Sequence, residues 1–140
     1  MNDVKRKNVD LLVENFWKRG YLTVSRKFGT YLPEPSKVGI FDVDVVAKLR
    51  KNYAIGITLS SKDLEDPDLL KRIKFLATRQ TKYTNKRVQL FIGVPAENYR
   101  TVKSLISILN EDERKNIKIV MISERKFQTA RQDKSQVLFS

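Results

Sequence analysis

The sequence contains no cysteine and no histidine. Without cysteine it can form neither a disulfide nor a zinc–thiolate site, and without histidine it has no imidazole for catalysis or metal ligation. Nucleophilic catalysis by a Ser–His or Cys–His pair is excluded for the same reason. Any metal ion would therefore be held by oxygen ligands, which favours magnesium, manganese or calcium.

Long hydrophobic runs and glycine-rich loops are also missing. No apolar stretch approaches the about 20 residues of a membrane span, and residues 1–10, MNDVKRKNVD, lack the apolar core of a signal peptide. These features predict a cytoplasmic protein that does not associate with membranes. No glycine-rich loop follows a predicted strand, which argues against a phosphate-loop nucleotide enzyme.

Acidic residues are few relative to basic ones. The chain has 16 Asp and Glu against 28 Lys and Arg, which gives a net charge of +12 over 140 residues. Such an excess is typical of proteins that bind an anionic partner, most often nucleic acid. A solvated, lysine-rich surface that aids solubility is the alternative. The positive charge is spread over every predicted element, which favours a nucleic-acid partner.

The length and the 41% hydrophobic content fit one domain with a substantial core. The predicted elements are a helix over 3–19, a strand over 21–28, a hairpin over 38–61, a helix from 66, a strand over 87–94, a helix over 96–109 and a strand over 116–122. Strands that alternate with helices pair in parallel, and a hairpin adds antiparallel pairing. The sequence predicts an α/β domain over residues 1–122, followed by a basic C-terminal tail or edge element over 123–140.

The first helix and the segment at 111–115 carry two more detailed predictions. Residues 111–115 read as a charged turn. The apolar side chains of the first helix recur at the spacing that places them on one buried face, with Asp10 at the edge of that face. The predicted buried face consists of Val9, Leu12, Val13, Phe16 and Trp17.

The functional interpretation depends on the hairpin over 38–61. Its first strand would place Asp42 and Asp44 on one face, and the predicted register sets Asp44 opposite Thr58, with all the apolar residues on the other face. Acids within a valine-rich strand are unfavourable unless something offsets their desolvation. A metal ion could do so, and so could ion pairs with a nearby base. The candidate bases for such ion pairs are Lys48, Lys62 and Arg26.

The order of elements, together with the acid-bearing hairpin, resembles the PD-(D/E)XK nuclease superfamily, most closely the archaeal Holliday-junction resolvases. The resemblance covers roughly residues 9–122, and its anchors are the helix end at Gly20, the strand with Arg26, and Asp44 with the turn that follows it. It implies a restriction-endonuclease-like mixed sheet with helices packed on it. It also implies DNA rather than RNA as the partner, and a homodimer as an arrangement open to this chain.

In that family an aspartate on the second strand and a Glu-x-Lys motif on the third hold a divalent metal, Mg²⁺ or Mn²⁺. Carried over to this chain, Asp44 matches the aspartate, whereas Gly56 and Thr58 occupy the Glu-x-Lys positions. The candidate catalytic and metal-binding residues are therefore Asp44 and Asp42, with Asp10 as a further candidate on the helix. Neither glycine nor threonine can replace a carboxylate or an ammonium group. The resemblance thus favours a nuclease-like protein that binds nucleic acid without standard metal-dependent catalysis.

Two other functions stay open: an active metal-dependent DNA endonuclease with a rearranged site, and a basic subunit with a structural or protein-interaction role. The loop over 29–39 combines basic residues with Tyr31, which could stack on a base or tuck under the sheet. The candidate nucleic-acid-binding residues are Arg26, Lys27, Tyr31, Lys37, Lys48, Arg50, Lys51, Lys62, Lys71, Lys74, Arg79 and Lys82.

Overall fold

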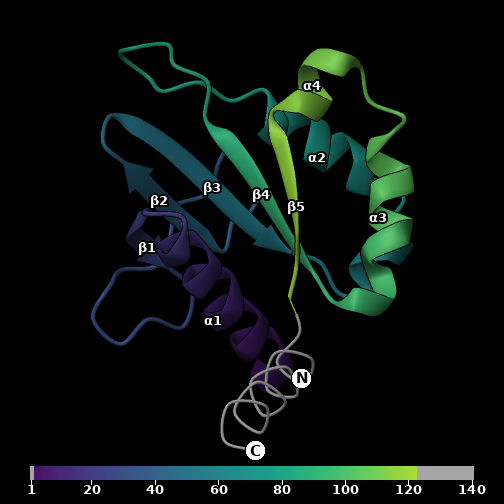
Figure 1. Ribbon diagram of the computed structural model, residues 1–140, viewed down its shortest axis with the longest axis horizontal. Helices are drawn as coiled ribbons and strands as arrows, with labels where there is room; N and C mark the ends of the chain where they lie inside the picture. Colours follow the sequence, from purple (N-terminus) through teal and green to yellow (C-terminus); the bar gives the residue numbers. More distant parts are fainter. Residues whose placement is uncertain (1, 123–140) are drawn as a thin grey trace, which may run out of the picture.

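The computed structural model describes residues 2–122 of the chain, and the predicted tail over 123–140 lies outside them. Five strands form one mixed sheet in the order β1-β2-β3-β4-β5 (Figure 1). β1 pairs with β2 and β2 with β3 in antiparallel fashion, whereas β3 with β4 and β4 with β5 are parallel. This confirms the predicted α/β class and mixed sheet. The strands are β1 (Leu22–Arg26), β2 (Val45–Leu49), β3 (Asn52–Thr58), β4 (Gln89–Val94) and β5 (Ile117–Met121).

Helices cover both faces of this sheet (Figure 1). α1 (Asn2–Lys18) lies on one face, where its apolar side chains join those of β2, β3, β4 and β5 in one buried cluster. α2 (Leu69–Ala77), α3 (Tyr99–Ile106) and the short α4 (Glu111–Lys115) lie on the other side, with the two 3₁₀ turns η1 (Asp63–Glu65) and η2 (Ala96–Asn98) in the connections. Among the described residues, no helix combines the length and the apolar character that crossing a membrane requires.

Close packing of α1 on the sheet depends on Gly56. A Cβ atom at this position would lie 2.8 Å from both Leu12 Cδ2 and Phe16 Cε2. Phe16 also packs against Phe91 of β4, with ring centroids 4.6 Å apart. Glycine at position 56 therefore lets the helix lie directly on the central strands.

The register of the β2–β3 hairpin differs by one residue from the prediction. Val45 pairs with Gly56, and Arg50 and Lys51 form the turn, so the predicted register is wrong. Residues 40–44 are not part of β2, so the strand-like alternation of side chains between two faces does not extend through them. The apolar residues of the hairpin occupy both faces, because Val45 packs toward α1 and Ile55 packs into the opposite cluster.

Two smaller predictions are also wrong. Trp17 was expected on the buried face of the first helix, but its exposed fraction is 70%. Residues 111–115 form the helix α4 rather than a turn. A capping box begins this helix: Asn110 Oδ1 accepts a hydrogen bond from Glu113 N–H at 2.8 Å, and Glu113 Oε1 accepts one from Asn110 N–H at 3.2 Å.

Candidate functional site

Asp44 provides a buried carboxylate at the entrance to β2. Its exposed fraction is 2%. The Asp44 N–H donates to the Gly56 carbonyl at 2.9 Å, and the Asp44 carbonyl accepts from the Lys27 N–H at 2.9 Å. Asp44 and Val45 thus both lie opposite Gly56, an arrangement like that of a β-bulge, and both face α1. Because two consecutive side chains lie on the same face here, the carboxylate of Asp44 points toward α1.

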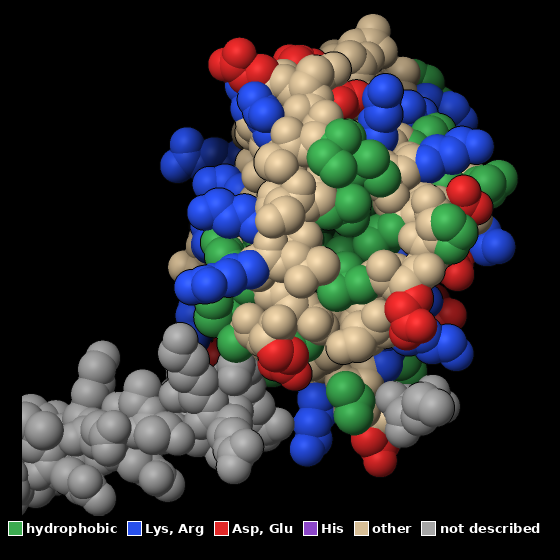
Figure 2. Space-filling view, turned by 90° about the vertical axis from the view of Figure 1, so that its right-hand side faces the viewer, with side chains coloured by type: hydrophobic (Ala, Val, Ile, Leu, Met, Phe, Trp, Pro, Cys, Tyr) green, Lys and Arg blue, Asp and Glu red, His purple; other side chains and the backbone are tan. Residues whose placement is uncertain are grey.

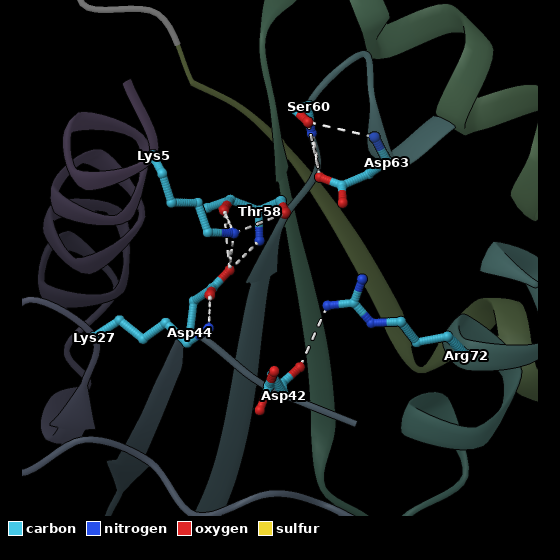
Figure 3. A network of polar contacts seen from close by, with 8 residues as sticks. All are labelled: Lys5, Lys27, Asp42, Asp44, Thr58, Ser60, Asp63 and Arg72. Atoms are coloured by element: carbon cyan, nitrogen blue, oxygen red, sulfur yellow. Dashed lines mark hydrogen bonds and ion pairs between the residues drawn. The ribbon is translucent and has the colours of Figure 1, made fainter. Parts of the chain in front are cut away.

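Four contacts offset the desolvation of this carboxylate (Figure 3). Asp44 Oδ2 accepts hydrogen bonds from Thr58 N–H at 2.7 Å, from Thr58 Oγ1 at 2.9 Å and from Lys5 Nζ at 2.9 Å. Lys27 Nζ lies 3.7 Å from Asp44 Oδ1. Lys5 also donates to Thr58 Oγ1 at 2.6 Å, so the helix, the hairpin and the end of β1 meet in one polar cluster. We call Asp44, Thr58, Lys5 and Lys27 the Asp44 cluster.

The donor chemistry of the Asp44 cluster does not fit a divalent metal. It contains one carboxylate and two ammonium groups, so its formal charge is positive and repels a cation. Three hydrogen bonds already converge on Asp44 Oδ2. A magnesium or manganese ion needs several oxygen ligands, and within residues 2–122 no group of three or more Asp, Glu, His or Cys side chains is placed to hold a metal ion.

The other two candidate acids do not join this cluster. Asp42 is exposed, and its backbone carbonyl accepts a hydrogen bond from Arg72 at 3.3 Å, on the side of α2 (Figure 3). The prediction that Asp42 and Asp44 share a strand face is wrong, because residues 40–44 precede β2. Asp10 is half-exposed on α1 and forms an ion pair with Arg26 of β1. A catalytic or metal-binding role for any of the three stays a prediction.

Asp44 does form ion pairs, but the predicted partners were wrong. Lys5 and Lys27 pair with it, not Lys48, Lys62 or Arg26. Lys5 supplies an ammonium group from α1 beside Thr58. A signal for Lys5 was present in the sequence: it lies four residues before Val9 and so extends the buried stripe of the helix.

Four of the predicted nucleic-acid-binding residues come together on the opposite side of the sheet. They are Lys37, Lys48, Lys51 and Lys82, and Lys86 joins them around an open groove of about 700 Å³. We call it the lysine groove, and all five lysines are exposed. Its other lining residues are Ser25, Ser36, Val38, Val46, Tyr53, Ile55, Thr81, Tyr83, Thr84 and Val88.

The remaining candidates lie elsewhere. Lys71 and Lys74 lie beside the partly apolar surface of α2 and α4, where Lys74 Nζ is 3.9 Å from Glu113 Oε2. Figure 2 looks onto this helical side of the molecule, where basic and acidic side chains surround a central group of hydrophobic ones. Arg79 stacks on Phe75, with the guanidinium carbon 3.7 Å from the ring centroid. Lys27 belongs to the Asp44 cluster, and Arg50 and Lys62 are exposed.

Tyr31 is 96% exposed, so it does not tuck under the sheet. It lines a smaller pocket with Arg6, Asp10, Arg26 and Phe28. Because Arg26 is paired with Asp10, part of the positive charge in that pocket is already neutralised. The lysine groove and the Asp44 cluster are therefore the two candidate sites, one on each face of the sheet. Comparison of the chain with protein-family models, with curated proteins and with solved structures gives no match.

Proposed function

We propose that this chain is a cytoplasmic nucleic-acid-binding protein of nuclease-like fold that lacks standard metal-dependent catalysis, with DNA as its partner. The lysine groove is the observation that carries the proposal. Five lysines surround it, and the described residues that line it include no Asp or Glu. A concave surface of one charge sign attracts and orients a polyanion, and the net charge of +12 adds long-range attraction.

The order of elements supports the nuclease-like part of the proposal. Apart from the 3₁₀ turns and the short α4, the order is a helix, three strands, a helix, a strand, a helix and a final strand, and Asp44 stands at the entrance to the second strand. Restriction-endonuclease-like proteins share this order. A homodimer, as in the resolvases, is part of the same proposal, and sedimentation of the protein with and without a DNA junction tests it.

The Asp44 cluster supports the absence of catalysis. The motif's glutamate position is Gly56, and Leu12 and Phe16 fill the space into which a side chain would project. The motif's lysine position is Thr58, which donates two hydrogen bonds to Asp44. The carboxylate is thus held by N–H, O–H and ammonium donors, all of which compete with a metal ion for its oxygens.

A binding and cleavage panel tests the proposal. Four-way junctions, duplexes and single strands of DNA and RNA are offered with Mg²⁺ or Mn²⁺. We expect binding that weakens steeply with salt, and no cleavage. Metal-dependent cleavage that Asp44→Asn abolishes, in a variant whose circular dichroism and Tm match those of the parent protein, would establish the endonuclease alternative instead. Failure to bind any of these nucleic acids at low salt would favour the structural or protein-interaction role.

A further inference from the structure

The lysine groove combines an apolar floor with a charged rim. Its floor includes Val46 of β2, Ile55 of β3 and Val88, which directly precedes β4. Ile55 and Val88 are buried, with exposed fractions of 5% and 8%. A volume of about 700 Å³ lies within the range of about 300–1,000 Å³ that is usual for small-molecule sites. The groove therefore has room for an apolar, planar group below the level of the lysines.

Tyr83 stands at the edge of this groove with 92% of its surface exposed. It belongs to the loop over 79–88, which extends beside the β2–β3 turn at one end of the sheet (Figure 1). The loop is closed by its own hydrogen bonds: Thr81 N–H donates to the Lys86 carbonyl at 2.8 Å, and Val88 N–H donates to the Arg79 carbonyl at 2.9 Å. An exposed aromatic ring is thus presented on a locally ordered support.

The lysines of the rim come from three separate segments. Lys37 lies in the loop before β2, Lys48 and Lys51 lie on or beside the β2–β3 turn, and Lys82 and Lys86 flank Tyr83. Lys48 Nζ also lies 5.3 Å from the ring centroid of Tyr53, close enough for a cation–π interaction. Cations from three segments around an apolar floor suit a chain of phosphates that passes over the groove.

We infer that the lysine groove binds a single-stranded segment of nucleic acid, an inference that rests on the proposed function. Unpaired bases cover the apolar floor and stack on Tyr83, while the lysines contact the phosphates. A duplex keeps its base faces stacked inside the helix, so it could contact the lysines but would leave the floor and the Tyr83 ring uncovered. The apolar floor thus distinguishes this groove from a surface built for duplex phosphates alone.

The first test compares Tyr83→Ala with Tyr83→Phe by fluorescence anisotropy. The probes are one labelled oligonucleotide as a single strand and the same oligonucleotide as a duplex. Loss of a stacking platform weakens single-strand binding, and we expect about a 5- to 100-fold loss for Tyr83→Ala. Tyr83→Phe keeps the ring and should bind like the parent protein. Duplex binding should change little with either variant.

The second test removes charge from the rim. Lys82→Gln combined with Lys86→Gln removes two rim lysines, and Lys103→Gln combined with Lys115→Gln removes the same charge from exposed sites on α3 and α4. Each lost phosphate contact lowers the slope of log K against log salt by about 0.7 for a single strand, so the rim variant should lose about 1.4. The α3/α4 variant should keep the parent slope.

The outcomes separate this inference from the proposed function. Losses that are equal for single strand and duplex, or no loss with Tyr83→Ala, would overturn the single-strand assignment while nucleic-acid binding itself stands. A parent protein that binds neither probe would overturn both. If the rim variant loses affinity for vesicles of anionic lipid but not for the oligonucleotides, the groove is a lipid-binding surface and the inference is wrong.

Discussion

Asp44 shows how the fold stabilises a charged side chain that it takes out of water. Its carboxylate is almost fully buried, and a buried charge is unfavourable unless it is paired and hydrogen-bonded. Lys5, Lys27 and Thr58 supply those partners from three different parts of the chain. Through these contacts the carboxylate holds α1 and the strands together.

Asp44→Ala should strongly destabilise the protein. It leaves two ammonium groups without their carboxylate and the Thr58 N–H without its acceptor. Lys5 and Lys27 are partly exposed and can be solvated, but a buried N–H left without its acceptor costs about 1–3 kcal/mol, and we expect a loss of at least that size in the free energy of unfolding measured with urea. Asp42→Ala is the matched control, because Asp42 is exposed and should change stability by no more than about 0.5 kcal/mol. Equal losses in the two variants would contradict the role of the Asp44 cluster.

Gly56→Ala tests the close approach of α1 to the sheet. The new methyl group would lie 2.8 Å from atoms of Leu12 and Phe16, both fully buried, so the helix or their side chains must shift. Such overpacking costs about 1–3 kcal/mol. Gly93→Ala in the neighbouring strand is the control: its nearest atom is Ile122 Cδ1 at 3.2 Å, the end of a flexible side chain. Urea unfolding should therefore show a smaller loss for Gly93→Ala, and the reverse order would contradict this packing.

The sequence identified Asp42 and Asp44 as acids that need an explanation, but not which of them is buried. An acid among valines is visible in the sequence pattern, whereas its desolvation depends on tertiary structure: Asp42 is exposed and Asp44 is buried. The partners of Asp44 cannot be predicted from the pattern either, since Lys5 lies 39 positions away and reaches Asp44 only once α1 docks on the sheet. The lysine groove was missed as a unit for the same reason: the periodicity of separate segments does not show that their basic residues converge.

At the scale of elements, the spacing of apolar residues predicted burial correctly where one side of an element is buried along its whole length. The spacing of apolar residues in the helix from 66 predicts a buried stripe of Leu69, Leu70, Ile73, Leu76 and Ala77. All of them are buried in α2 except Leu70, which is partly buried. The predicted start of β2 was wrong because residues 40–44 show the alternation of apolar and polar residues that is typical of a strand, although β2 begins only at Val45. A tight turn at Gly39 intervenes, with a φ of 64°, and Val38 bridges to Phe41 across it. Gly39 is the sequence signal for that turn, and the alternation of apolar residues after it predicts a strand instead.

The capping box of α4 gives a prediction at this scale. A helix of five residues has little stability of its own, so the bond from Asn110 Oδ1 to the Glu113 N–H supports much of its first turn. Asn110→Ala should lower the free energy of unfolding by about 1 kcal/mol, with a matching fall in Tm. Asn98→Ala is the control, because Asn98 occupies the same position before α3 but makes no capping bond. A larger effect from Asn98→Ala would contradict the assignment.

At the scale of the whole molecule, the excess of 12 positive charges must repel itself in the folded state. Two unit charges 10 Å apart in water repel by about 0.4 kcal/mol, and many such pairs exist on a surface of this charge. Salt at about 0.1 M screens exposed charges beyond about 10 Å but acts much less on partly buried pairs such as Asp44 with Lys5. Salt should therefore relieve the repulsion without breaking the Asp44 cluster.

We expect the Tm of the protein to rise as sodium chloride is increased from about 10 mM to about 0.15 M, because the Debye length falls from about 30 Å to about 8 Å over that range. Chloride is preferred to sulfate, which stabilises most proteins by exclusion from their surfaces. Nucleic-acid binding should weaken over the same range, since counterion release opposes it. Salt should thus raise the thermal stability of the protein while it lowers the affinity for nucleic acid. A Tm that falls with sodium chloride would mean that attractive ion pairs outweigh the repulsion, and the charge excess would then lose its force as an argument for a polyanionic partner.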